Sequence, residues 1–356
     1  MTSLLSTGWS DVLSRLPASL DLTALAREHG AIKRMRRVSD GETLLRLALW
    51  YGPGGMSLRS ASALASGTQT AELSDVALLK RLRGAADWLE AIVSAKLTER
   101  QTLVSALSRP LVLVDGTSLS QQGSCGTDWV LHSRYNPQVG FTGFTLTDCH
   151  DAETLKRHTI NPGEIVIADR FYGRGPELVH VLECNADFIV RAGWNAMAWR
   201  DAQGNVMDIL APLAPMKAGE TKDLWVDIKT GKQTLRLRLV VEARDEEATK
   251  IAVDQVRRKA KKNGRTGDPR SIEAARYMII ATSLDPHDYP AERIIELYRI
   301  RWQIELAFKR LKSIVHLGRV PAKGAKLART WLYAHLLLAL LVDEITQQLL
   351  DSPPCA

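Results

Sequence analysis

Two short, unbroken apolar runs, each followed by an aspartate, place the strongest constraint on the fold of this chain. Residues 111–114 in the stretch LVLVDG precede Asp115, and residues 165–168 in EIVIADR precede Asp169. Runs of this length and continuity are typical of strands that are buried on both faces of a sheet. We therefore expect two central strands that each end on an acid.

The segments around these runs predict an α/β fold with a mixed sheet, because strand patterns come first and then alternate with helix patterns. The expected strands are residues 128–136, 141–150 and 187–194, and the expected helices are residues 151–157 and 175–184. From residue 195 to 285, polar and apolar residues alternate, which favours half-exposed antiparallel strands. We interpret this stretch as a β-rich insertion that interrupts the core.

The N-terminal part of the chain predicts short helices. Apolar residues recur there at spacings of three and four, and Ser57 and Ser74 can cap two of the expected helices, residues 57–67 and 74–97. Short helices with basic ends suit a small DNA-binding domain, although other helical domains share this pattern. The expected division is a helical DNA-binding domain (1–105), the first part of the core (106–194), the insertion (195–285), and the second part of the core with C-terminal helices (286–356).

Composition narrows the class of protein. A chain of 356 residues with 45% hydrophobic and 24% charged residues is typical of a soluble globular protein. The net charge of +7 favours a polyanionic partner such as nucleic acid, although many basic proteins bind none. The four cysteines are scattered, which argues against a zinc site or a disulfide framework. The N-terminus lacks a signal-peptide pattern and the apolar run 331–342 is too short to span a bilayer, so we expect no membrane association and a cytoplasmic location.

The stretch YRIRWQIELAFKRLK, residues 298–312, carries polar residues at unexpected places for an amphipathic helix. In one continuous helix, at ~100° per residue, Tyr298, Arg301, Glu305 and Lys312 fall within an arc of roughly 60° that borders the apolar face. Charged residues often border such faces, so this strip has functional meaning only if it meets partners elsewhere in the chain.

Three carboxylates provide such partners. Asp115 and Asp169 are expected at one edge of the sheet, where ligands usually bind, and Glu305 comes from the polar strip of the helix. Oxygen ligands of this kind suit Mg²⁺, and two ions about 4 Å apart can promote phosphodiester cleavage. An aspartate after a strand can equally be a helix cap or a turn residue, so each acid alone is a weak signal. The chain has no P-loop motif.

The spacing Tyr298-x2-Arg301-x3-Glu305-x6-Lys312, with the segments LVDGT and IADRFYG, resembles the insertion sequence 4 family of DDE transposases over roughly residues 105–345. The resemblance implies an RNase H-like core and a catalytic, metal-binding triad of Asp115, Asp169 and Glu305. It also implies two Mg²⁺ ions, for which Mn²⁺ can substitute, and cut-and-paste transposition of the protein's own element through a DNA hairpin. The implied partners are double-stranded DNA, as terminal inverted repeats and as target, and a second copy of the chain in a synaptic homodimer. The expected location is the bacterial cytoplasm, in association with the nucleoid.

The resemblance also assigns DNA contacts to the helical strip. Tyr298, Arg301 and Lys312 would contact phosphates near the scissile bond, which agrees with the fit of the arginine fork to phosphate oxygens and with the point charge of lysine. The hydroxyl of Tyr298 can donate to a phosphate, but its ring can equally pack in the core.

Aromatic and basic residues elsewhere complete the expected DNA site. The family places a tryptophan before the helix that carries the tetrad of Tyr298, Arg301, Glu305 and Lys312, where its ring stacks on a displaced base. Tyr277 occupies that place here, and Trp194 is a second candidate. Both could instead be core residues.

Arg170 and Arg191 follow the expected strands and are candidate phosphate contacts, with an ion pair or an exposed strand end as the alternative. The basic segment 257–265 either follows the DNA backbone or is a solvated run of charge.

Two other functions stay open from the sequence. One is an RNase H-like nuclease that cuts DNA without joining it, and the other is a DNA-binding regulator with an inactive catalytic site. The three acids argue against the regulator. The sequence continues for about 45 residues after Lys312, from which we expect no long C-terminal dimerisation region of the kind found in larger relatives, so the resemblance does not define the dimer contacts.

Overall fold

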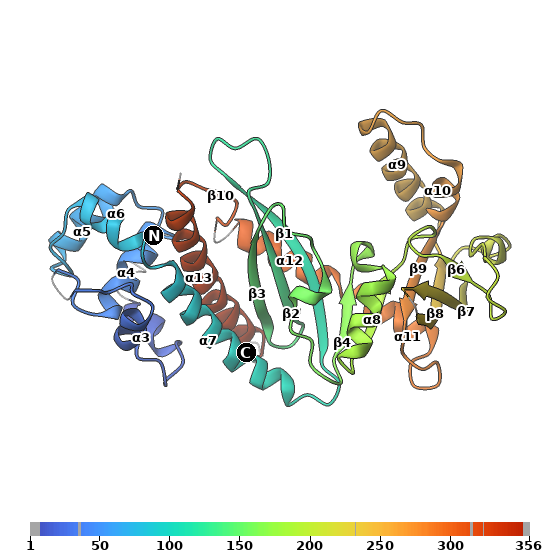
Figure 1. Cartoon of the computed structure of the whole chain (residues 1–356), viewed down its shortest axis with the longest axis horizontal. Coiled ribbons are helices and arrows are strands. Elements are labelled where there is room, and N and C mark those ends of the chain that lie inside the picture. Colours follow the sequence, from blue (N-terminus) through green and yellow to red (C-terminus); the bar gives the residue numbers. More distant parts are fainter. Residues whose placement is uncertain (1–7, 35–36, 232, 314–315, 323, 352–356) are drawn as a thin grey trace, which may run out of the picture. The chain divides into compact units, whose positions relative to one another are not determined.

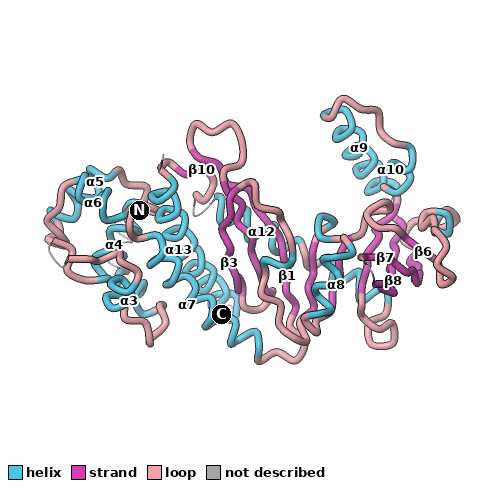
Figure 2. The backbone as a smooth tube through the Cα atoms, in the orientation of Figure 1, coloured by secondary structure: helices cyan, strands magenta, loops and turns pink. Residues whose placement is uncertain are grey.

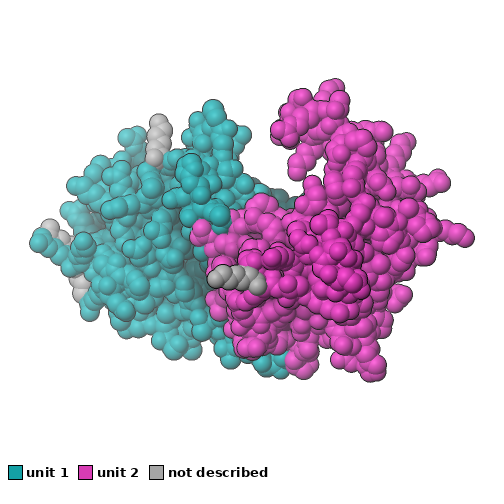
Figure 3. Space-filling model, turned by 45° about the vertical axis from the view of Figure 1, so that its right-hand side comes forward, with its two compact units in different colours: residues 1–107, 116–152, 305–356 teal, residues 108–115, 153–304 magenta. Residues whose placement is uncertain are grey.

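A computed structural model describes residues 8–34, 37–231, 233–313, 316–322 and 324–351. The chain divides into two units, shown in separate colours in Figure 3. Unit 1 contains residues 1–107, 116–152 and 305–356, and unit 2 contains residues 108–115 and 153–304. The chain therefore passes between the units inside one strand, β1 (Leu111–Gln121), and inside one helix, α12 (Trp302–Ser313). The four-part division expected from the sequence stays a prediction.

The N-terminal part of unit 1 is helical, as expected (Figure 1). Its helices are α2 (Trp9–Ser14), α3 (Leu22–Glu28), α4 (Gly41–Tyr51), α5 (Leu58–Gly67), α6 (Asp75–Leu82) and α7 (Ala86–Ser105). Ser57 and Ser74 cap α5 and α6 by accepting hydrogen bonds from backbone N–H groups of the first turn, which confirms that prediction. The expected helix 74–97 is two helices, because a break at residues 83–85, which include Gly84, separates α6 from α7.

The strands of unit 1 form the order β3-β2-β1. β2 (Trp129–Asn136) and β3 (Gly140–Asp148) are an antiparallel hairpin, and the short β10 (Arg319–Val320) pairs in parallel with the end of β1. The long helix α13 (Ala325–Asp351) packs on α4 and α7, and both α7 and α13 contact β3 (Figure 2).

Helix α13 contains the apolar run 331–342. The apolar run appeared too short for a bilayer, but the helix that contains it has a 23-residue stretch, Ala325–Gln347, that is long and apolar enough to cross one. In this structure, 72% of its apolar window is buried inside the fold, as in the core helix of a soluble protein.

Unit 2 is built on a mixed sheet in the order β1-β4-β5-β9-β8-β7-β6. β1, β4 and β5 run parallel, and each later neighbour is antiparallel, which confirms the predicted mixed sheet. The strands after β1 are β4 (Ile165–Ala168), β5 (Asp187–Arg191), β6 (Trp199–Arg200), β7 (Thr221–Thr230), β8 (Gln233–Ala243) and β9 (Tyr277–Thr282). Because β9 hydrogen-bonds to β5, strands from the expected insertion continue the same sheet.

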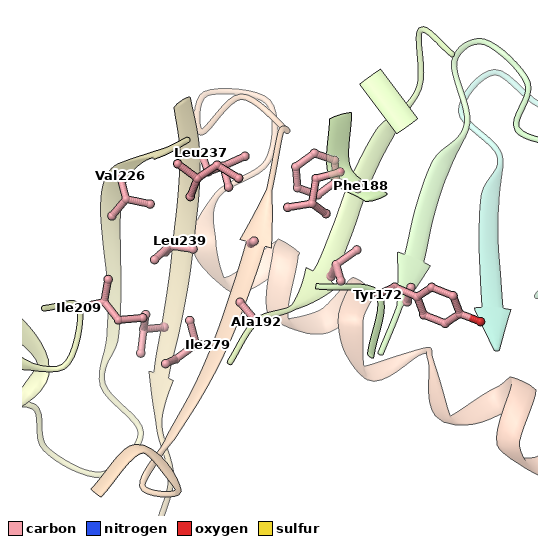
Figure 4. Close-up of a cluster of buried hydrophobic side chains, with 14 of the residues drawn as sticks. Tyr172, Phe188, Ala192, Ile209, Val226, Leu237, Leu239 and Ile279 are labelled. Carbon is pink, nitrogen blue, oxygen red and sulfur yellow. The ribbon is translucent and has the colours of Figure 1, made fainter. Parts of the chain in front are cut away.

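Helices cover both faces of this sheet. One face holds a large apolar cluster that includes Phe188, Leu239 and Ile279 (Figure 4) and residues of α8 (Gly175–Glu183). The other face is covered by α11 (Ala291–Arg299), whose Arg299 donates to Glu242 of β8 at 2.7 Å. Short 3₁₀ turns complete the unit: η1 (Leu155–Arg157), where a helix was expected, η2 (Arg170–Tyr172) and η3 (Ala211–Leu213).

Two helices inside the stretch 195–285 were not predicted. α9 (Glu246–Lys262) is capped by Asp245, and α10 (Pro269–Ala274) is capped by Asp268. Neither helix has a buried residue, and Figure 1 shows both beyond the strands of unit 2. The basic segment 257–265 is therefore mostly the last turns of α9. Its apolar residues were too few to reveal the helix from periodicity alone.

Candidate active site

Asp115 and Asp169 lie side by side on neighbouring parallel strands of unit 2. Val114 of β1 pairs with Ala168 of β4, and the two aspartates are the next residues along the chain. Since neighbouring strands are about 4.8 Å apart, the two carboxylates start from adjacent backbone positions. The prediction that Asp115 ends its strand is wrong, because β1 continues to Gln121.

Asp169 also has a local role in the backbone. It directly follows β4, as predicted, and its carboxylate accepts the N–H of Phe171 at 2.8 Å, which caps η2. The capping alternative left open by the sequence therefore holds for this residue. A single oxygen makes that hydrogen bond, and a carboxylate has further acceptor sites for a cation.

Tyr172 lies near these acids. Its side chain is fully buried, and its hydroxyl donates to Glu153 at 2.7 Å. Burial raises the pKa of Tyr172 well above its ordinary value, and the carboxylates of Glu153, Asp115 and Asp169 raise it further. Three carboxylates of unit 2 therefore act on this one hydroxyl.

Arg301 is the cation that faces this region. Its Nη1 lies 3.9 Å from Oδ2 of Asp115, and both side chains are 19% exposed. The guanidinium also lies 5.9 Å from the centre of the Tyr298 ring. Tyr298 is only 7% exposed, and burial raises its pKa, against the opposing charges of Arg301 and Arg191. Tyr298 therefore packs in the fold and also lies close to two cations of the candidate site.

The helix expected over residues 298–312 is in fact two helices. Tyr298 is in α11, Arg301 is in the turn that follows, and Glu305 and Lys312 are exposed on α12. In the turn, the N–H of Arg301 donates to the carbonyl of Tyr298, three residues back instead of four. The arc of roughly 60° calculated for one regular helix therefore does not describe these four residues.

The basic residues predicted at the strand ends gather in unit 2. Arg191 is half-buried at the end of β5, and the guanidinium of Arg170 lies against Gly193, where a Cβ atom would come within 2.8 Å of Nε. Partial burial and the charge of Arg191 both lower the pKa of Arg170. The same two causes lower the pKa of Arg244, which the sequence analysis missed. Its signal was available, since Arg244 follows an apolar strand in VVEAR as Arg191 does in DFIVR.

The two aromatic candidates for base stacking have different surroundings. Tyr277 is 4% exposed at the start of β9, and its hydroxyl donates to the carbonyl of Leu213 at 3.0 Å. This is the position of a core residue, the alternative that the sequence left open. Trp194 is half-buried, its Nε1 donates to Ser271 at 3.3 Å, and the guanidinium of Arg270 lies 4.7 Å from the centre of its ring.

The acids fit part of a divalent-metal site. Asp115 and Asp169 supply adjacent carboxylates, the oxygen ligands that Mg²⁺ prefers. Glu305 belongs to unit 1 and the two aspartates to unit 2. Within the part of the chain that the structure describes, no group of three His, Cys, Asp or Glu residues has the arrangement of a complete metal site.

This chain is similar to one family of domains and to several transposases. The model of a family described as "Transposase DDE domain" matches residues 106–341. The chain is 41% identical over 355 residues to the transposase for insertion sequence element IS421 of Escherichia coli, covering 97% of this chain and 96% of that protein. It has the same identity over 354 residues to InsL of E. coli K12, a protein assigned as a transposase to element IS186A, and 26% identity over 365 residues to the transposase for element IS231F of Bacillus thuringiensis.

Proposed function

Because this chain belongs to the DDE transposase family, we propose that it cuts and pastes its own insertion element by metal-dependent hydrolysis and transesterification of phosphodiester bonds. The observation that carries the proposal is the placement of Asp115 and Asp169 directly after two paired residues of neighbouring parallel strands. The 41% identity over nearly the whole chain to a transposase of an insertion sequence supports the same activity. We also propose membership of the insertion sequence 4 group, with an RNase H-like core, on the tetrad spacing.

The DDE domain implies a divalent metal ion, and we propose Mg²⁺, with two ions held by Asp115, Asp169 and Glu305. When bound, such ions would activate the attacking oxygen and stabilise the leaving oxygen. The chain's own residues hold the DNA. Arg301 lies close to Asp115, and its guanidinium can leave that carboxylate to bind the oxygens of a phosphate. Tyr298 and Lys312 would contact neighbouring phosphates.

For the hairpin intermediate, we propose Trp194 as the ring that receives a displaced base, ahead of Tyr277. Tyr277 would have to leave the core and give up its hydrogen bond to Leu213, whereas Trp194 is already half-exposed. A base would either use the ring face opposite Arg270 or displace that guanidinium. The partners proposed are the terminal inverted repeats, the target DNA and a second copy of the chain, with the N-terminal helices reading sequence.

The test is cleavage of duplexes carrying the element ends by the purified chain, with Mg²⁺, with Mn²⁺ and with chelator. Asp115→Asn and Asp169→Asn should abolish cleavage and leave duplex binding within about threefold. Asp187→Asn is a matched control on the opposite end of β5, where the carboxylate pairs with Arg109 at 2.9 Å. Full cleavage by either active-site variant would reject the metal assignment.

Strand transfer separates the remaining alternatives. A transposase should join the cut ends to a supercoiled target, while a nuclease of the same fold should release ends that are never joined. An inactive regulator should bind the ends and cut none of them, in either metal.

A further inference from the structure

Arg191 and Arg244 point to the same face of the unit 2 sheet. Arg191 pairs with Ile280 of β9, and Ile280 pairs with Val240 of β8. Arg244 follows β8, and its N–H donates to the carbonyl of Arg276 at 2.8 Å, so the ladder extends to it. Side chains alternate along a strand, and Arg244 is four residues beyond Val240, so it shares the face of Arg191. α11 and Tyr298 cover this face.

The carboxylates near Arg244 each accept a hydrogen bond from another residue. Glu242 accepts a hydrogen bond from Arg299 at 2.7 Å, and Asp245 accepts the N–H of Ala248 at 2.7 Å as the cap of α9. Among the described residues, the Nε of Arg244 is buried and has no hydrogen-bond partner. Burial and the charge of Arg191 lower the pKa of Arg244, whereas Glu242, Tyr298 and Asp245 raise it.

Two half-buried guanidinium groups on one face of a sheet favour an anion, because a buried charge is costly unless it is paired. An anion with several oxygens fits best, since an arginine fork binds two oxygens of one phosphate. Tyr298 adds a neutral hydroxyl near both arginines, and Asp115 and Asp169 lie in the same unit.

We propose that Arg244, together with Arg191, holds a backbone phosphate of the DNA strand that enters the site of Asp115 and Asp169. This inference rests on the proposed function and adds a positioning residue to it. Arg244 does not touch the reacting atoms. It fixes the strand one or more nucleotides from the scissile phosphate. Loss of Arg244 should therefore reduce the affinity for DNA by a larger factor than it changes the concentration of metal ion that cleavage requires.

The test uses the full chain and element-end duplexes in which single phosphates are replaced by neutral methylphosphonates. In the parent, one replacement near the cleavage site should weaken binding about tenfold, as should Arg244→Gln on the natural duplex. The two changes together should cost no more than either alone, because they remove the same contact. Arg236→Gln, an exposed arginine on the same strand, is the control and should leave every duplex bound as in the parent.

Thermal unfolding without DNA gives a second readout. Arg244→Gln removes a half-buried charge whose Nε has no hydrogen-bond partner among the described residues, so its unfolding midpoint should equal or exceed that of the parent, whereas a purely structural arginine should lower it. A lowered midpoint, or additive effects at every methylphosphonate position, would overturn the proposal. So would protection of the parent by inorganic phosphate without any position-specific effect on DNA, which would assign the site to a free anion. If the parent binds as described but cuts no DNA, the proposed function fails and the phosphate site stands.

Discussion

The guanidinium of Arg301 lies 3.9 Å from the carboxylate of Asp115, although 186 positions of sequence separate the two residues. The ion pair joins a strand of the unit 2 sheet to the turn between α11 and α12. It also places the one arginine of the tetrad beside the first acid of the candidate triad. A cation at this point can neutralise the charge of the carboxylate before DNA binds and can contact a phosphate once DNA is bound.

Arg301→Ala should therefore reduce element-end cleavage about ten- to a hundredfold, the decrease expected when a charged group that stabilises the transition state is removed. Arg301→Lys should recover only part of the rate, because lysine keeps the charge without the fork. Initial rates at saturating Mg²⁺ measure both effects. Arg293→Ala, which removes an exposed pair with Glu296 on α11, should cut at the parental rate. Equal rates for Arg301→Ala and the parent would contradict the role of Arg301.

The basic end of α9 should contribute to DNA binding in a salt-dependent way. Residues 255–267 include six Lys or Arg residues and no acid, and the side chains of Arg258, Lys261 and Lys262 are exposed. Changing these three to Gln should reduce the slope of log K against log salt by about 0.9 for each phosphate that the protein no longer neutralises. Lys217→Gln with Lys229→Gln, exposed lysines elsewhere in unit 2, is the control. An unchanged slope in the triple variant would identify the end of α9 as a solvated run of charge.

The sequence predicted the sheet of unit 2 better than its edges and turns. Continuous apolar runs identified β4 and the start of β1, because burial on both faces leaves a local signal. The second half of β1, from Gly116 to Gln121, is polar and forms a strand through hydrogen bonds to partners distant in sequence. No local pattern predicts such partners. The break at residues 300–301 was equally hidden, since a turn with bonds three residues back preserves nearly helical spacing.

The candidate site was predictable where a motif or a strand end marked it. Asp115, Asp169, Tyr298 and Arg301 were proposed in this way, and all four belong to unit 2. Arg244 was missed because its relation to Arg191 depends on two strand pairings, β5 with β9 and β9 with β8, which single-sequence patterns do not reveal. Tyr277 was chosen as a stacking residue by its position in the chain, and its burial could not be predicted because it depends on packing against residues such as Leu213.

Gly140 should tolerate no side chain. It has a φ of +88°, and a Cβ atom there would collide with the carboxylate of Asp343, which Arg100 holds at 2.6 Å in unit 1. Gly123 has nearly the same φ, +89°, but among the described residues no heavy atom lies within 4 Å of its Cβ position. Gly123→Ala should cost about 1 kcal/mol, the strain of a left-handed residue. Gly140→Ala should cost roughly 3 kcal/mol or more, because it also disrupts a buried ion pair. Similar unfolding free energies for the two variants in urea would contradict this explanation.

His335 should make the protein sensitive to mild acid. Burial lowers its pKa to about 4, while its Nδ1 donates to the carbonyl of Trp331 at 2.7 Å. The unfolded chain takes up this proton near pH 6.5, so below that value protonation favours unfolding, and the stability due to neutral His335 is lost between about pH 6.5 and 4. The loss should be on the order of 3 kcal/mol. His335→Gln should flatten the decline in urea unfolding over this range, and His287→Gln, at an exposed site, should not. A decline as steep in His335→Gln as in the parent would assign it to other groups.

The last prediction separates the two aromatic candidates for the hairpin. Tyr277→Phe removes only the hydroxyl that donates to Leu213, so it should lower the unfolding free energy by about 1 kcal/mol and leave the yield of hairpins unchanged.

Trp194→Ala removes a half-exposed ring, and stacking of a base on such a ring contributes ~1–3 kcal/mol. Its hairpin formation should therefore slow about ten- to a hundredfold, while the first nick proceeds at nearly the parental rate. Denaturing gels of end-labelled duplexes distinguish nicked strands from hairpins. Trp225→Ala is the matched control, since Trp225 is exposed on β7 beside Arg236 and lies outside the proposed site. Hairpins formed at the parental rate by Trp194→Ala would mean that the displaced base stacks on another residue.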